Sequence, residues 1–211
     1  MQKVMVIAAH SDDIEFSCSG TMAKLANEGR EITYVVLSAG EKGNKKEVPK
    51  DKIVDVRKKE QREAADVVGV KKLIFLGIED GTIKNDEKLR KELVKLIRTY
   101  KPDTIFTFDP DCNLENFYTY HSDHRETAIA VFDAASPRAG NKYYYLELNL
   151  EPHRIETFYF FASDKPNEFV DITNFIDIKI KAIKCHESQM MFDKGQLEKF
   201  IKKRADESGK R

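Results

Sequence analysis

Two short clusters of histidines and carboxylates hold the residues most able to do chemistry. The first reads A-H-S-D-D-I-E over residues 9–15, and the second reads H-S-D-H-R-E over residues 121–126. Imidazole nitrogens and carboxylate oxygens are good ligands for zinc, and three protein ligands plus water make a catalytic site. His121 and His124 are three residues apart, so they share a face if a helix begins there. Three of the five histidines lie in the two clusters, which favours a metal site.

Both clusters follow apolar segments that have the character of buried strands. Strand-like segments alternate with helical ones, with strands expected at 4–9, 32–37, 73–76 and 104–108 and helices at 21–28, 51–68 and 86–100. The alternation predicts an α/β fold, a Rossmann-like open and mostly parallel sheet with helices on both faces. Ligands in such sheets bind beyond the carboxyl ends of the strands. The two clusters therefore face each other if the first and fourth strands are neighbours.

The remainder of the chain adds smaller elements to this core. Residues 143–162 are rich in tyrosine and phenylalanine and predict one or two further strands, whereas 176–185 has a helical pattern. The charged tail, about 193–211, predicts a helix that frays. The chain has 211 residues, and we find neither an internal repeat nor an interdomain linker. We therefore expect a single domain over 1–211.

Composition limits the classes of partner. The 36 basic side chains balance 36 acidic ones, so overall charge gives no reason to expect a nucleic acid partner. No apolar run approaches the roughly 20 residues that span a bilayer, so no membrane partner is expected. Cys18, Cys112 and Cys185 have no C-x-x-C spacing, which predicts reduced thiols in a cytoplasmic protein. The aromatic region 143–161 could supply a homo-oligomer interface.

Three alternatives to a hydrolytic metal site deserve comparison. A nucleotide-binding turn is disfavoured because Asp12, Asp13 and Glu15 would repel phosphate. An iron(II) oxygenase could use His10, Asp12 and His124, but such enzymes generally have an antiparallel double-stranded β-helix, which the βαβ pattern contradicts. A binding module that keeps the metal without catalysis has no need of a free carboxylate beside its ligands, as Asp12 would be.

Six motifs, in the same order along the chain, resemble the LmbE-like, or PIG-L, family of zinc-dependent N-acetylglucosaminyl de-N-acetylases. AAHSDDIEFSCSG resembles the family's A-H-P-D-D-E segment, and HSDHRETA resembles its H-P-D-H segment. Weaker matches are LSAGEKG, VRKKEQREAADVVGV, FLGIEDG and CHESQM, so the resemblance covers roughly residues 3–190. Serines replace the usual proline or glycine at Ser11, Ser17, Ser19 and Ser122. They should loosen the turns without removing a ligand.

The resemblance implies a metal-dependent hydrolase that removes the acetyl group from an N-acetylglucosamine-type substrate. It places the ligands of zinc, which iron(II) could replace, at His10, Asp13 and His124. Asp12 then corresponds to the general base that activates a zinc-bound water. His121 corresponds to the group that stabilises the oxyanion, to which it would donate if it is protonated. Asp123 corresponds to a carboxylate that orients or tunes a histidine.

The substrate pocket is less well defined by the resemblance. Its matched motifs make Arg57, Glu60 and Asp80 candidates for the pocket, while His186 could line its mouth or only pack against it. From the residues alone, Arg57 and Glu60 could equally form an exposed ion pair on a helix. The aromatic residues within 109–120 could wall the pocket and stack on a sugar ring, or only pack the loop. Which N-acetylated sugar is bound stays open.

Overall fold

A single sheet of parallel strands forms the centre of the molecule. The computed structural model describes residues 2–43, 45–111, 121–191 and 193–210, and within them five strands pair in the order β3-β2-β1-β4-β5. The strands are β1 Lys3–Ala8, β2 Glu31–Val36, β3 Lys72–Phe75, β4 Thr104–Phe108 and β5 Thr157–Phe161. Every pairing is parallel, and β1 lies between β2 and β4. The predicted α/β fold is confirmed, as is the adjacency of the first and fourth strands.

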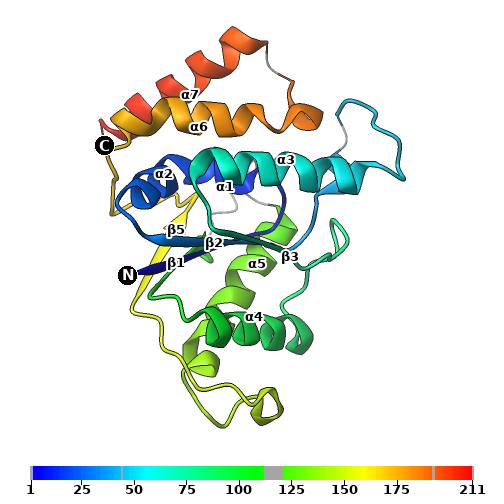
Figure 1. Cartoon of the computed structure of the whole chain (residues 1–211), viewed down its shortest axis with the longest axis vertical. Helices are drawn as coiled ribbons and strands as arrows, with labels where there is room; N and C mark the ends of the chain where they lie inside the picture. The colour runs from blue at the N-terminus through cyan, green and yellow to red at the C-terminus, as the bar shows by residue number, and fades with distance from the viewer. Residues whose placement is uncertain (1, 44, 112–120, 192, 211) are drawn as a thin grey trace.

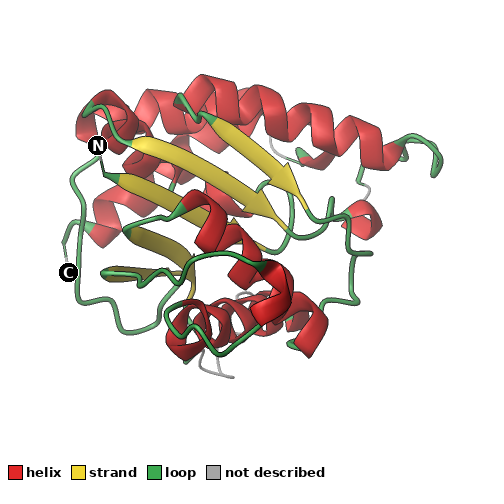
Figure 2. Cartoon of the chain, turned by 60° about the horizontal axis from the view of Figure 1, so that its bottom comes forward, coloured by secondary structure: helices red, strands yellow, loops and turns green. Residues whose placement is uncertain are grey.

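Helices cover both faces of this sheet (Figures 1 and 2). They are α1 Asp13–Ser17, α2 Ser19–Asn27, α3 Ile53–Val68, α4 Glu87–Tyr100, α5 Ser122–Asp133, α6 Ile176–Lys184 and α7 Lys194–Ser208. In Figure 1, α4 and α5 lie on one side of the sheet, and α1, α2 and α3 lie on the other. Helix α6 packs on α2 and α3, and α7 packs on α6. The C-terminal helices therefore form a third layer over the face that carries α1.

Local sequence explains where the longer helices begin and end. The Asp86 carboxylate accepts a hydrogen bond from the Leu89 backbone N–H at 2.8 Å, which caps the first turn of α4. Gly69 follows α3 with a φ of 90°, a left-handed conformation that favours glycine at a helix end. Helix α4 buries Leu93 and Ile97 completely. Leu93 and Ile97 thus lie on the face of α4 that packs into the hydrophobic core.

The structure differs from the expectations mainly at short elements. Only residues 157–161 of the region 143–162 form a strand, because the left-handed residues Tyr145 and Asn149 interrupt the extended conformation before it. Helix α3 begins at Ile53, two residues after the expected start at residue 51. The short helix α1 was not anticipated. The charged tail forms α7 as expected.

Two further expectations from the sequence concern membrane-spanning helices and the state of the cysteines. Within the described residues, none of the helices combines the length and the apolar character needed to cross a membrane. Cys18 and Cys185 are free thiols, whereas Cys112 and the rest of residues 112–120 lie outside the described residues. The expectation that this segment walls a pocket stays a prediction.

The burial of α4 in the hydrophobic core predicts the effect of one truncation. Leu93 has no exposed surface, so Leu93→Ala should lower the free energy of unfolding by about 2–5 kcal/mol through lost burial and a residual cavity. Leu146, 69% exposed, provides the matched control, and Leu146→Ala should change stability by less than about 0.5 kcal/mol. Urea unfolding measures both. Equal losses in the two variants would contradict this account of the core.

Candidate active site

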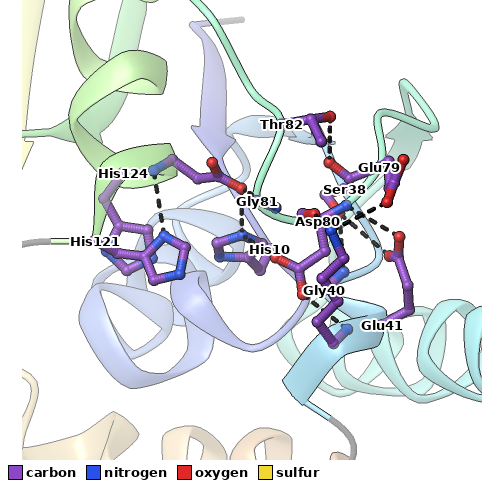
Figure 3. A network of polar contacts seen from close by, with 12 residues as sticks. His10, Ser38, Gly40, Glu41, Glu79, Asp80, Gly81, Thr82, His121 and His124 are labelled. Carbon is purple, nitrogen blue, oxygen red and sulfur yellow. Dashed lines mark hydrogen bonds and ion pairs between the residues drawn. The ribbon is translucent and has the colours of Figure 1, made fainter.

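The two predicted clusters meet at the carboxyl end of β1 (Figure 3). His10 follows β1, while His121 caps the N-terminus of α5 and His124 lies in its first turn. The ring centroid of His10 is 4.9 Å from that of His121 and 5.3 Å from that of His124. The parallel pairing of β1 with β4 thus brings together side chains more than 100 positions apart in the sequence.

Asp13 lies between His10 and His124. Its Oδ1 is 3.2 Å from His124 Nε2, and its Oδ2 is 3.6 Å from His10 Nδ1. Oδ2 also accepts a hydrogen bond from the His10 backbone N–H at 2.7 Å. Burial alone would raise the pKa of Asp13, but the charges and hydrogen bonds of His124 and His10 outweigh it and hold the pKa well below the usual range. Asp13 is therefore an ionised carboxylate that contacts two imidazoles.

The other nitrogen of His10 faces two further carboxylates. Nε2 is 3.2 Å from Asp80 Oδ1 and 3.1 Å from Asp123 Oδ2. Burial opposes protonation of His10, but its hydrogen bonds with Asp13 and Asp80 prevail and raise its pKa to about 11. Burial would raise the pKa of Asp80, but the hydrogen bond and charge of His10, together with a hydrogen bond from the Lys42 backbone, lower it to about 2. These carboxylates therefore stabilise a positive charge at this point of the structure.

The donor atoms are close enough together to hold a cation. Within the described residues, two groups have donor atoms within 4.8 Å of one another, namely His10, His121 and His124, and His10, Asp80 and Asp123. Asp13 adds an ionised oxygen in contact with two members of the first group. Asp123 Oδ1 is buried without a hydrogen-bond partner among the described residues, a condition that a nearby cation or water would relieve. Imidazole and carboxylate donors in this number fit zinc.

Asp12 lies beside this group in a different environment. Its backbone has a φ of 84°, a left-handed conformation that is uncommon for residues other than glycine. Its Oδ2 accepts a hydrogen bond from Arg57 at 3.1 Å, and its backbone N–H donates to Gln61 Oε1 at 3.0 Å. Burial raises the pKa of Asp12 to about 6, although the Arg57 charge opposes the shift. A carboxyl with this pKa can exchange protons near neutral pH.

His121 has a defined tautomer at the N-terminus of α5. Its Nδ1 accepts a hydrogen bond from the Asp123 backbone N–H at 3.2 Å, so in the neutral ring the proton lies on Nε2. Burial lowers the pKa of His121, and the charges of His10 and His124 lower it further. The lowered pKa favours the neutral ring, which already offers an Nε2–H donor, so the donor role expected of His121 does not require its protonation.

Arg57 and Glu60 are buried, so the alternative of an exposed ion pair between them is wrong. Arg57 is 3% exposed and donates to Asp12, to the Ser11 carbonyl at 2.7 Å and to the Gly40 carbonyl. Glu60 accepts hydrogen bonds from the backbone N–H and the hydroxyl of Ser188, both at 2.7 Å. Because both Glu60 oxygens are engaged inside the protein, the structure does not support a substrate contact for Glu60.

The structure gives no support to a substrate contact for His186, and favours the alternative that His186 only packs behind the pocket. The ring has no exposed surface, and its Nε2 is 3.1 Å from Glu15 Oε2. Burial favours the neutral ring, but the hydrogen bond and charge of Glu15 prevail and raise the pKa of His186 above the usual 6.5. Glu15, likewise without exposed surface, accepts two further hydrogen bonds from Gln61. Both residues therefore belong to a buried network behind the turn that carries Asp12.

Glu15 and Gln61 were not assigned a role in this network from the sequence. A signal was present in α3, where the buried positions are Ile53, Arg57, Glu60, Gln61, Ala64, Ala65 and Val68. Three polar residues thus occupy a stripe that is otherwise apolar. Polar side chains on the core-facing stripe of a helix need buried partners, which here come from residues 10–15 and 186–189.

The chain was compared with known proteins by sequence and by structure. The sequence model of the family described as GlcNAc-PI de-N-acetylase matches residues 5–135. Diacetylchitobiose deacetylase of Thermococcus kodakarensis is 32% identical over 93% of this chain and 73% of its own length. The crystal structure of N,N'-diacetylchitobiose deacetylase from Pyrococcus horikoshii, complexed with its inhibitor MPG, superposes with a TM-score of 0.85 at 30% identity, covering 95% of this chain and 75% of that one. The 4-oxalmesaconate hydratase of Pseudomonas putida is 27% identical over 89% of this chain and 74% of its own.

The Glu15–His186 pair predicts a pH-dependent contribution to stability. Because the folded-state pKa of His186 is raised, the pair stabilises the fold fully below the unfolded-state value near 6.5, and this contribution is lost as the pH rises through the folded-state pKa. At pH 5.5, His186→Gln should lower the free energy of unfolding by about 3 kcal/mol by leaving a buried carboxylate without its cation. The loss should shrink above pH 6.5.

Urea unfolding at several pH values measures this dependence, and Glu15→Gln serves as the reference background. With Glu15 replaced, the His186 substitution should be less costly and its effect should no longer decline above pH 6.5. A loss that is independent of pH in the wild-type background would show that His186 contributes packing alone.

Proposed function

Because this chain belongs to the GlcNAc-PI de-N-acetylase (PIG-L) family, we propose that it is a metal-dependent hydrolase that removes the acetyl group from an N-acetylglucosamine-type substrate. The observation that carries the proposal is the contrast between two adjacent carboxylates. Asp13 contacts two histidines, whereas Asp12 contacts Arg57 and has a pKa raised to about 6. The first suits a metal ligand and the second a general base.

The proposed metal ligands are His10, Asp13 and His124. Two imidazoles and one ionised carboxylate, with a further position for water, are the donor set of many catalytic zinc sites. A bound cation would replace the proton that the surrounding carboxylates favour on His10. When bound, zinc supplies the Lewis acidity that polarises an amide carbonyl and lowers the pKa of water toward roughly 7. Iron(II) accepts the same donors, so the donor set does not select between the two metals.

The side chains around the ligands supply the proton transfers of amide hydrolysis. Ionised Asp12 accepts the proton of the attacking water, and the protonated carboxyl can return it to the leaving amine. The Nε2–H of neutral His121 donates a hydrogen bond to the tetrahedral oxyanion, a type of contact that contributes roughly 3 kcal/mol. Arg57 keeps the Asp12 carboxylate in place through its contact with Oδ2.

The iron(II) oxygenase and the non-catalytic metal-binding module lose support as alternatives to a hydrolase. A different reaction is suggested by the name of one relative. The parallel sheet differs from the antiparallel β-helix of iron(II) oxygenases. A metal-binding module without catalysis gives no reason to hold Asp12 in a left-handed conformation beside the ligands. The sequence similarity to 4-oxalmesaconate hydratase indicates that water addition to a double bond is a second reaction to test.

The function is tested with purified, zinc-loaded protein and a panel of N-acetylated sugars. The panel includes free N-acetylglucosamine, chitin-type oligomers, and inositol-, thiol- and malate-linked N-acetylglucosamine. Release of acetate together with a free amine supports the proposal and identifies the substrate. An unsaturated dicarboxylic acid serves as the hydratase arm. Activity on that acid with none on any amide would contradict the proposed deacetylation.

Asp12→Asn separates proton transfer from metal binding. The variant keeps the side-chain size but loses the basic oxygen, so acetate release should fall by about 10²- to 10⁴-fold while metal content stays unchanged. The matched control is Asp13→Asn, the same substitution one residue further on, which should lose the metal. Elemental analysis and acetate release are measured for both.

The pH profile provides a second readout. Wild-type activity should rise as Asp12 ionises, with its acidic limb at or below pH 6, because the burial that raises this pKa to about 6 is opposed by a bound cation. The limb should be absent from the residual activity of Asp12→Asn. Near-normal turnover in a fully metallated Asp12→Asn would exclude Asp12 as the base.

A further inference from the structure

The ring of His124 lies against an aromatic side chain from the end of β4. Phe108 is the last residue of β4, and its ring is stacked on the imidazole, with 4.1 Å between the ring centroids and 13° between the ring planes. Phe108 is 5% exposed, so this contact belongs to the protein interior. The ring of a proposed metal ligand is therefore supported by the sheet, in addition to its contact with Asp13.

The register of the sheet places Phe108 in a row of aromatic side chains. Strand β4 pairs with β5 so that Phe106 lies opposite Tyr159 and Phe108 lies opposite Phe161. Phe106 stacks on Tyr159 at 4.7 Å and 17°, whereas Phe108 meets Phe161 at 4.7 Å and 66° in a T-shaped arrangement. The Asp109 N–H donates to the Phe161 carbonyl at 3.1 Å, which continues the pairing past the end of β4. Phe108 is thus held by its neighbour on the edge strand.

The two contacts of His124 constrain different features of its ring. The contact between Nε2 and Asp13 Oδ1, at 3.2 Å, fixes where one nitrogen lies but leaves the ring free to tilt about it. A stack over the face of the ring fixes its plane, and the lone pair with which an imidazole binds a metal lies in that plane. The orientation of His10, by contrast, is set by carboxylates at both of its nitrogens.

We propose that Phe108 is a positioning residue for His124, and that its ring sets the plane of this proposed ligand. The inference rests on the metal site of the proposed function. In this role Phe108 acts on the reaction through His124 and touches no reacting atom. An aliphatic side chain could fill the same space, but it has no flat face to restrict the tilt of the imidazole.

The test is Phe108→Leu, which removes the flat ring and keeps an apolar side chain. Zinc affinity, measured without substrate by competition with a chromophoric chelator, should fall by about 3- to 10-fold, the size of effect that one aromatic pair contributes. The matched control is Phe106→Leu. Phe106 lies two residues earlier on the same face of β4, is 6% exposed and stacks on Tyr159 instead of His124. Its zinc affinity should not change.

Further measurements separate positioning of His124 from a general loosening of the fold. The visible absorption spectrum of the cobalt(II)-loaded protein reports the geometry of the ligands, and it should change in Phe108→Leu but not in Phe106→Leu. At saturating zinc, kcat of Phe108→Leu should fall while KM stays within about twofold. Phe108→Tyr keeps the ring and should retain wild-type zinc affinity. If Phe108→Leu does not fold, Phe108→Met is measured in the same way.

The outcomes distinguish this inference from the proposed function. Equal losses of zinc affinity in Phe108→Leu and Phe106→Leu, no loss in either, or an equal loss in Phe108→Tyr would each overturn the inference. Acetate release accompanied by any of these results would retain the deacetylation alone. A protein that releases no acetate from any sugar, but loses zinc affinity in Phe108→Leu and not in Phe106→Leu, would contradict the deacetylation and retain the positioning role.

Discussion

The concentration of negative charge around one imidazole is the constraint on which this site depends. Three largely buried carboxylates contact the ring of His10, and each also accepts one backbone N–H, with the three donors being His10 for Asp13, Lys42 for Asp80 and Gly81 for Asp123. Buried charges are costly unless they are paired and hydrogen-bonded. Their compensation requires positive charge at or beside His10. The loops after β1, β2 and β3 and the first turn of α5 therefore have to meet at this point.

A second group of buried residues lies behind the carboxylates around His10. It holds the turn that carries Asp12 in place and, within the described residues, does not contact His10. Helix α3 contributes Arg57, which contacts Asp12, and Gln61, which joins the Asp12 backbone to Glu15. The C-terminal part of the chain completes this group, because Lys179 of α6 donates to the carbonyls of the last turn of α1 at 2.7, 3.1 and 3.2 Å. Burial lowers the pKa of this lysine to about 8. The outer helices thus contribute to holding a turn to which they add no ligand.

The sequence was sufficient for the features that depend on local pattern. Alternating apolar segments predicted the parallel sheet, and clustered histidines and aspartates predicted which residues meet beyond β1 and β4. The partners of Asp80, Glu60 and His186 could not be predicted in this way. They depend on which side of a loop or helix faces the interior, and a motif gives a residue's position in the chain but not its orientation. Asp80 was a candidate for the pocket, and His186 for its mouth or for the packing against it. In the structure Asp80 contacts His10, and His186 is fully buried against Glu15.

The left-handed backbone of Asp12 indicates which residue the surrounding buried side chains hold in position. A left-handed conformation in a residue other than glycine costs of order 1–3 kcal/mol and persists only where the surroundings impose it. Arg57 and Gln61 impose it here by holding the side chain and the N–H of Asp12. The proposed ligands require none of this, because Asp13 contacts His10 and His124 without Asp12. One protein similar to this chain, 27% identical over 89% of it, is a 4-oxalmesaconate hydratase, whose name denotes a reaction other than deacetylation. Asp12, the residue beside the proposed ligands, is held in a strained conformation and has a pKa raised to about 6, and it is therefore the residue on which the proposed chemistry depends.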